Sequence, residues 1–171
     1  ENTECGLLTV CTAYGEVITN IRRTTTFEDN VTIIHSSEGN YVINKKKRLT
    51  TNSHERITIN KQRKYITLKD GNTRQFIDFD GNVLGQIEGK YENCLLYKES
   101  GVVVCMINEQ GGIYYQIYSL DGELLNDSKF SYIGSFNENY AVCVTDSHVP
   151  IDEKFFREAK KETFLFFKRR N

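Results

Sequence analysis

Phe27-Glu-Asp-Asn-Val-Thr-Ile-Ile34 aligns without gaps with two later segments, Tyr97-Lys-Glu-Ser-Gly-Val-Val-Val104 and Phe136-Asn-Glu-Asn-Tyr-Ala-Val-Cys143. Each segment begins with an aromatic residue, passes through an acidic residue to a small polar one, and ends in a β-prone run. Asn and Ser favour turns, and Asn tolerates the left-handed backbone conformation better than most residues. The pattern therefore predicts a turn that leads into a β-strand, repeated along the chain.

The spacing of these segments predicts a fourth copy. The first aromatic residues, Phe27 and Tyr97, lie 70 residues apart, which is about twice 35, and Tyr97 and Phe136 lie 39 apart. A degenerate copy is therefore expected between the first two. Residues 56–68 fit this place, because two short strand patterns there, 57–59 and 65–68, flank a basic turn.

Glycine-containing turns follow the repeated strands. Glu38-Gly39, Asp70-Gly71 and Gly111-Gly112 each precede a second run of β-branched and aromatic residues. Further Asp-Gly turns recur at Asp80-Gly81 and Asp121-Gly122. Such dipeptides between strand patterns indicate hairpins, because glycine supplies the positive φ that tight turns need.

These patterns predict an all-β fold of about four tandem antiparallel strand–turn–strand repeats, arranged either like a propeller or as a β-solenoid. We expect residues 1–150 to form this β-repeat domain and residues 151–171 to form a C-terminal capping segment. Phe155 and Ala159 lie one helical turn apart, which predicts a short C-terminal helix over 151–162. The expected core residues lie in the clearest strand patterns: Val31, Ile33, Tyr65, Ile66, Phe76, Val103, Ile117, Ala141 and Val142.

The strings 90–112 and 129–146 resemble the bacterial WG-repeat family, in which an aromatic residue and a turn precede a β-run and a second strand. The similarity extends over about 20–145 and is clearest over 76–145. It implies propeller-like or solenoid-like β units that act as an accessory or interaction module without defined catalytic residues. The chain departs from the family in having no tryptophan, and Asn30 and Asn139 stand where the family has glycine.

The composition is that of a folded chain, since hydrophobic residues make up 39% of it. The longest apolar run, 102–107, is far shorter than the roughly 18 residues of a membrane helix. Three of the five cysteines, Cys11, Cys105 and Cys143, lie in strand-like apolar runs. We interpret them as core thiols of a protein in a reducing compartment, and we expect a cytoplasmic location.

The sequence contains no motif that indicates catalysis. His35, His54 and His148 have no metal-ligand spacing and no Cys-x-x-Cys is present, so we predict no metal site. Nucleophile-elbow, phosphate-loop and dinucleotide motifs are absent from the sequence. We therefore expect no enzymatic activity, no catalytic residue and no cofactor.

Charge is distributed unevenly along the chain. Residues 1–75 carry a net charge of +4, residues 76–150 carry −8, and residues 151–171 carry +3. The basic residues of the first part form clusters, which we take as candidate partner-binding residues: Arg22, Arg23, Lys45, Lys46, Lys47, Arg48, Lys61, Arg63 and Lys64.

Two functions are compatible with these features. The first is a non-catalytic interaction or scaffolding module with a protein partner, since stacked repeats present extended binding surfaces. The alternative is a nucleic-acid-binding domain that uses the basic half of the chain to contact phosphates. Self-association through the opposed basic and acidic parts is a third way in which the charges could act.

Overall fold

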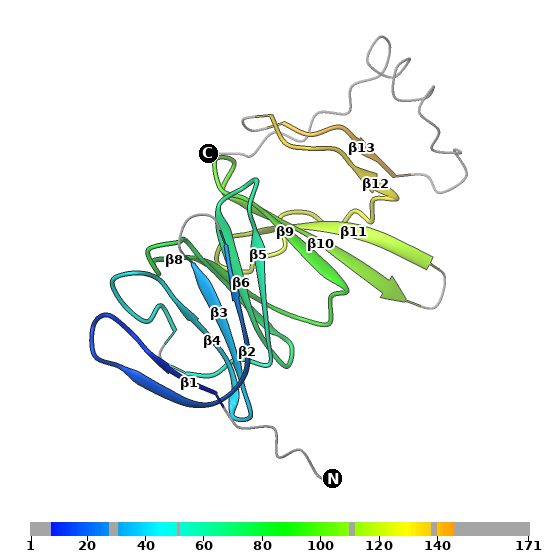
Figure 1. Cartoon of the computed structure of the whole chain (residues 1–171). Helices are drawn as coiled ribbons and strands as arrows, with labels where there is room; N and C mark the ends of the chain where they lie inside the picture. Colours follow the sequence, from blue (N-terminus) through cyan, green and yellow to red (C-terminus); the bar gives the residue numbers. More distant parts are fainter. Residues whose placement is uncertain (1–7, 28–30, 51, 110–111, 138–139, 146–171) are drawn as a thin grey trace. The chain divides into compact units, whose positions relative to one another are not determined.

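The computed structural model describes residues 8–27, 31–50, 52–109, 112–137 and 140–145 (Figure 1). Every regular element in these ranges is a β-strand, and the strands form four small antiparallel sheets. The predicted all-β class is therefore confirmed. The predicted helix over 151–162 lies outside the described residues.

Each sheet is built from strands that follow one another in the sequence, as hairpin signals predict. The first sheet has the order β1-β2-β3-β4, with strands Leu8–Cys11, Val17–Thr26, Thr32–Ser36 and Gly39–Ile43. The second has the order β5-β6-β7-β8, with strands Arg56–Asn60, Tyr65–Asp70, Thr73–Ile77 and Val83–Glu88. The predicted fourth repeat is the β5–β6 hairpin of this sheet.

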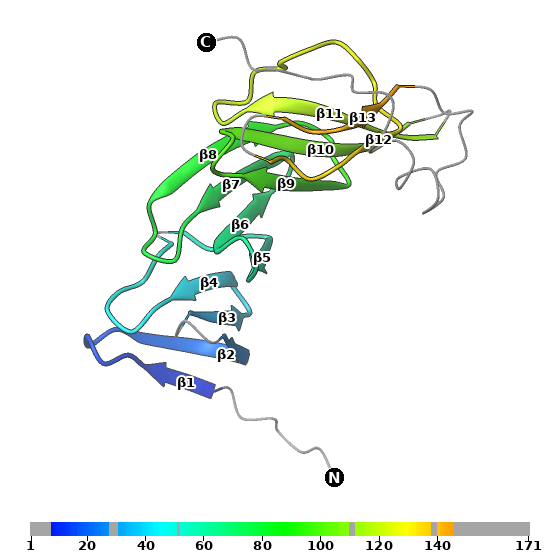
Figure 2. The ribbon, with the colours of Figure 1, turned by 90° about the horizontal axis from the view of Figure 1, so that it is seen from above.

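The remaining strands form two further sheets. The third sheet has the order β11-β10-β9, with strands Asn93–Tyr97 (β9), Val102–Glu109 (β10) and Gly112–Ser119 (β11), and β10 and β11 form its long hairpin (Figure 2). The fourth pairs β12, Tyr132–Ile133, with β13, Cys143–Val144. None of the four sheets is closed or curled into a propeller or a solenoid.

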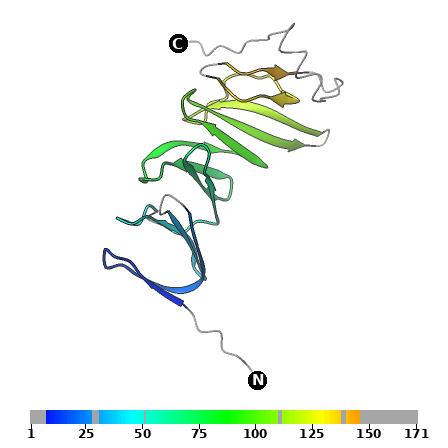
Figure 3. The same cartoon turned by 45° about the horizontal axis from the view of Figure 1, so that its top comes forward.

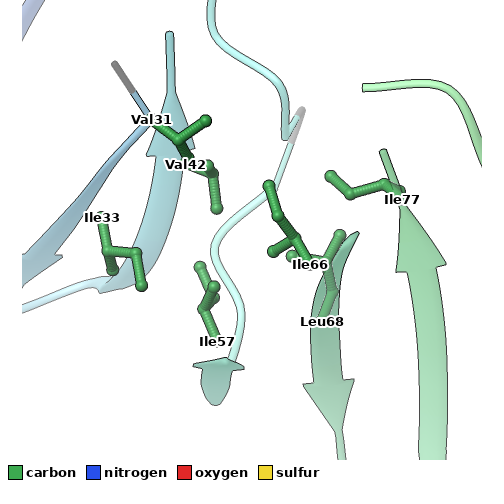
Figure 4. Close-up of a cluster of buried hydrophobic side chains, with 7 residues drawn as sticks. All are labelled: Val31, Ile33, Val42, Ile57, Ile66, Leu68 and Ile77. Atoms are coloured by element: carbon green, nitrogen blue, oxygen red, sulfur yellow. The ribbon is translucent and has the colours of Figure 1, made fainter. Parts of the chain in front are cut away.

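The chain divides into two compact units, Glu1–Gln86 and Ile87–Asn171. In unit 1 the core lies between the first and second sheets (Figure 4). Its buried members come from both sheets: Val31, Ile33, Val42, Ile57, Ile66, Leu68 and Ile77. A smaller cluster of Ile18, Ile21 and Ile34 uses the opposite face of the first sheet, because successive side chains of a strand alternate between faces.

The core of unit 2 lies between the third and fourth sheets and includes the repeated aromatic residues. Its buried members are Tyr97, Val102, Val104, Ile117, Phe130, Ala141 and Cys143. The rings of Tyr97 and Phe136, which begin the second and third repeats, pack edge to face with centroids 5.0 Å apart. The first aromatic residues of the second and third repeats therefore pack against each other within unit 2.

In the first repeat, one residue fewer separates the aromatic residue from its partner on the next strand. Tyr97 pairs with Val102 across a turn of four residues, and the bridge between Asn137 and Tyr140 places Phe136 opposite Ala141 in the same way. In contrast, the N–H of Phe27 donates to the carbonyl of Val31, which leaves three residues between them.

This difference changes which residues face the core, because a shift of one residue turns every side chain of a strand to the other face. Val102 and Val104 pack in the core of unit 2, whereas the corresponding Thr32 and Ile34 do not pack in the main core of unit 1. Val31 and Ile33 take that place instead.

Eight of the nine predicted core residues are buried, from Val31 to Ala141. The prediction for Val142 was wrong, since its side chain is 36% exposed. Its neighbours Ala141 and Cys143 both belong to the core cluster, so the alternation of the strand turns Val142 to the opposite face.

Candidate functional site

The nine predicted basic residues occupy four different places in unit 1. Lys45, Lys46 and Lys47 lie in the turn after β4, and Lys61, Arg63 and Lys64 lie in the turn between β5 and β6. Arg22 and Arg23 lie on β2. Arg48 lies apart from the other eight, against a pocket.

The turn after β4 holds three exposed lysines. The side-chain oxygen of Asn44 accepts the N–H groups of Lys46 and Lys47, both at 2.9 Å, and the N–H of Asn44 donates to the carbonyl of Lys47. In such a turn the Asn side chain takes the place of a backbone carbonyl and fixes the path of the chain. Among the residues that the structure describes, Lys45, Lys46 and Lys47 form no ion pair.

The turn between β5 and β6 lies at the same end of unit 1. Asn44 Nδ2 donates to the carbonyl of Phe79 at 3.3 Å, just beyond the end of β7. Ile77 of β7 pairs with Ile66, the second residue of β6, so the end of β7 adjoins the turn that begins β6. The structure therefore places Lys61, Arg63 and Lys64 and the three lysines after β4 at one end, which we call the lysine end.

Acidic residues reach the same end. Asp78 accepts the backbone N–H groups of Asp80 and Asn82 and the side-chain amide of Asn82, all within 2.9 Å. Burial acts to raise the pKa of Asp78, but these hydrogen bonds outweigh it and the pKa is lowered. Asp78 is therefore an anion at neutral pH, and Asp80 beside it is exposed. The lysine end is thus not uniformly basic.

Arg22 and Arg23 owe their common exposure to an irregularity in β2. The register between β2 and β3 shifts between Ile21 and Arg23, which makes Arg22 the extra residue of a bulge. Asn20, just before it, has a φ of +57° and accepts the N–H of Ser37. The curvature of β2 is visible in Figure 3.

Arg48 is held against the first sheet. Its Nη1 donates to Glu16 Oε1 at 2.9 Å, and its guanidinium lies over the ring of Tyr41, 4.1 Å from the centroid. The Nε of Arg48 is buried and has no hydrogen-bond partner among the described residues. Arg48 is therefore fixed by its ion pair with Glu16 and its contact with Tyr41.

A pocket of about 150 Å³ lies beside this guanidinium. It is lined by Glu16, Val17, Ile18, Thr19, Ser36, Glu38, Tyr41 and Arg48. Its volume is below the roughly 300–1,000 Å³ of small-molecule sites. Two carboxylates and one guanidinium make it suited to a group that both donates and accepts hydrogen bonds.

Next to the pocket lies a hairpin with exposed apolar side chains, residues 8–18, which we call the edge hairpin. Leu8 and Val17 are each 59% exposed and Tyr14 is 36% exposed. Burial raises the pKa of Tyr14, and the nearby carboxylate of Glu16 raises it further. β1 is an edge strand, and in the described residues it pairs only with β2.

The edge hairpin was not among the predicted site residues. Its signal was present in the sequence as an uncharged β-prone run, 8–11, followed by a glycine turn at Gly15. Proteins usually protect edge strands with charge, proline or a covering element. An edge strand of apolar and uncharged residues is therefore a feature that sequence reasoning can find once strand order is known.

The two histidines in the described ranges take part in a network that joins the first and second sheets. His35 Nδ1 lies 2.6 Å from Asn40 Oδ1, and Asn40 Nδ2 donates to the carbonyls of His54 and Glu55. His54 Nδ1 lies 2.5 Å from Asp70 Oδ2. These hydrogen bonds link the β3–β4 hairpin of the first sheet to the residues that lead into β5 of the second sheet.

Within the described ranges, no cluster of three or more His, Cys, Asp or Glu side chains has the arrangement needed to hold a metal ion. In the same ranges no helix has the length and hydropathy needed to cross a membrane.

Comparison with protein-family models and with curated proteins finds no match for this chain. The resemblance to the WG-repeat family therefore stays a prediction.

Proposed function

We propose that this chain is a non-catalytic β-repeat interaction module that binds a protein partner at the edge hairpin of unit 1. In this proposal the tandem units are variants of one strand–turn–strand pattern, and their edges and turns present the binding surface. The observation that carries the proposal is the exposure of Leu8 and Val17, 59% each, on a hairpin beside a polar pocket.

The chemistry of the pocket supports a polypeptide as the partner. A peptide backbone offers a carbonyl that can accept from the guanidinium of Arg48 and an N–H that can donate to Glu16 or Glu38. The unpaired side of an edge strand is a template for an added strand, which supplies main-chain hydrogen bonds. The exposed apolar side chains would then contact alternate residues of the partner.

Peptide selection tests this proposal. A random peptide display library is selected against the immobilised full chain, and the affinities of recovered peptides are measured by fluorescence anisotropy. A chain carrying Leu8→Asp and Val17→Asp should bind these peptides at least about tenfold more weakly, because charge replaces apolar contact area. Val83→Asp is the matched control, since Val83 is 60% exposed on the edge strand β8.

Comparison with the Val83→Asp chain separates an effect at the edge hairpin from a general effect of added negative charge. If the selection yields no peptide, or if recovered peptides bind the double variant as well as they bind the Val83→Asp chain, the edge hairpin is not the binding surface. Circular dichroism of both variants establishes that each chain retains its β-structure.

A second candidate function, nucleic-acid binding, is favoured by the lysine end. Lys45, Lys46 and Lys47 are exposed and lie at the same end of unit 1 as Lys61 and Lys64, a grouping that suits phosphate contacts. The pocket does not share this chemistry, because Glu16 and Glu38 repel phosphates from Arg48.

The two candidates respond differently to salt and to substitution. Phosphate contacts weaken strongly between about 50 and 200 mM salt. If the lysine end binds single- or double-stranded nucleic acid, anisotropy should show micromolar binding that is lost at the higher salt and in a Lys45→Gln, Lys46→Gln, Lys47→Gln variant. No binding at the lower salt would reject the second candidate.

A further inference from the structure

Two cysteines of unit 2 face each other across neighbouring strands. Cys94 of β9 pairs directly with Cys105 of β10, and their Sγ atoms lie 2.9 Å apart. Neither is in a disulfide in the structure. Non-bonded carbon atoms attract best at about 3.5–4.0 Å, and sulfur is larger than carbon. The two sulfur atoms are therefore already closer than ordinary packing brings them.

The backbone at this position suits a bond between the two side chains. The N–H of Cys94 is bonded to Asn93 Oδ1 at 2.9 Å, and β9 is an edge strand whose neighbour in the sheet is β10. This N–H therefore points away from β10, as it does in a non-hydrogen-bonded pair. Such pairs have Cα atoms about 4.5 Å apart, within the range of about 4.4–6.8 Å found in disulfides.

The surroundings differ for the two thiols. Cys94 is 6% exposed and lies on an edge strand, whereas Cys105 is fully buried on the central strand. The rings of Tyr91 and Tyr118 pack edge to face beside them, with centroids 5.4 Å apart. A reagent that approaches from the edge of the sheet thus meets Cys94 first.

We propose that Cys94 and Cys105 form a reversible disulfide site that reacts with small-molecule disulfides of the glutathione type. The Cys94 thiolate attacks one sulfur of the reagent, which forms a mixed disulfide and releases one thiolate. The Cys105 thiolate then attacks Cys94 Sγ, which forms the protein disulfide and releases the second thiolate. The protein loses two electrons and two protons, and the reagent is reduced to two thiols.

This site is distinct from the edge hairpin, which lies in unit 1. It also changes the interpretation of Cys105, which the sequence alone placed in the core as a separate thiol. Two cysteines that are eleven residues apart in sequence become opposite neighbours because the turn between β9 and β10 sets their register.

Mass spectrometry of the oxidised full chain tests the proposal. The native protein is incubated with oxidised glutathione, denatured, treated with iodoacetamide and digested with trypsin. Cleavage after Lys90, Lys98 and Lys129 places Cys94 in peptide 91–98 and Cys105 in peptide 99–129. The expected product is these two peptides joined by a disulfide, which dithiothreitol separates.

Variants identify the order of attack. In a Cys105→Ala chain, Cys94 should retain glutathione as a mixed disulfide, whereas Cys11→Ser should leave the 94–105 bond unchanged. The proposal is overturned if both peptides of the native chain are fully alkylated after oxidation. It is also overturned if Cys94 is joined to Cys11 or Cys143 instead of Cys105.

Discussion

Arg48 shows that neighbouring basic residues in the sequence can have different surroundings in the structure. Lys45 to Arg48 form one basic run in the sequence, but the bridge between Ile43 and Arg48 returns the chain to the first sheet. Arg48 is thereby paired with Glu16 and stacked on Tyr41. The sequence shows the basic run, but not which of its four residues faces the sheet, because that depends on where the turn ends.

Replacing Arg48 should destabilise unit 1, whereas replacing a lysine of the same run should not. Arg48→Ala removes a half-buried ion pair worth about 0.2–1 kcal/mol. It also removes a cation–π contact worth about 0.5–1 kcal/mol. We expect the free energy of unfolding in urea to fall by about 1 kcal/mol. Lys46→Ala, the control, should change it by less than about 0.5 kcal/mol.

A double-mutant cycle isolates the ion pair. Glu16→Gln should lower the free energy of unfolding less in the Arg48→Ala background than in the natural chain. Equal effects in the two backgrounds would mean that Glu16 and Arg48 do not stabilise each other, and that the guanidinium acts through its packing on Tyr41.

At the scale of the element, the repeated turn–strand pattern was predictable from the sequence. Which side chains of each strand face the core was not. The aromatic residue, the turn and the strand of each copy were predicted from residue types that have local preferences. The first copy has a turn of three residues in place of four, a difference that leaves the residue pattern unchanged but reverses the faces of its strand. Only the pairing of the strands reveals it.

Two glycines of the predicted turns differ in what surrounds them. Gly39 has a φ of +129°, and a Cβ added there would lie 2.5 Å from the Cβ of Ser53. Gly71 has a φ of +55°, and nothing lies within 4 Å of its added Cβ. Gly71→Ala should therefore lower the free energy of unfolding only by the cost of the left-handed conformation, about 1–2 kcal/mol. Gly39→Ala should lower the free energy of unfolding by about 1–3 kcal/mol more, because of the clash.

Thermal or urea unfolding of the two variants measures this difference. Ser53→Gly removes the atoms that the new Cβ would meet, so the combined Gly39→Ala, Ser53→Gly chain should recover part of the lost stability relative to Ser53→Gly alone. Equal losses for Gly39→Ala and Gly71→Ala would show that the close approach to Ser53 does not constrain the β3–β4 turn.

At the scale of the whole molecule, the two units differ in the hydrogen bonds that their carboxylates accept. Four carboxylates among the described residues have a lowered pKa, three in unit 1 (Glu55, Asp70 and Asp78) and Glu109 in unit 2. The N–H of Gly71 lowers the pKa of Glu55, with help from Lys69. Burial acts to raise the pKa of Asp70, but the N–H of Glu55 and the ring of His54 outweigh it.

These shifts predict that unit 1 loses stability in acid before unit 2 does. A carboxylate with a lowered folded-state pKa stabilises the fold fully above its unfolded pKa of about 4, and this stabilisation is lost as the pH falls through the folded value. Hydrogen exchange with mass spectrometry between about pH 5 and pH 3 should show amides of β5–β7 losing protection before those of β9–β11, after correction for the intrinsic rates. A chain with Asp70→Asn and Asp78→Asn should be less stable at pH 7 and should depend less on pH, because two of the titrating groups are gone. If both units lose protection together in the natural chain, the carboxylates of unit 1 are not what sets its stability in acid.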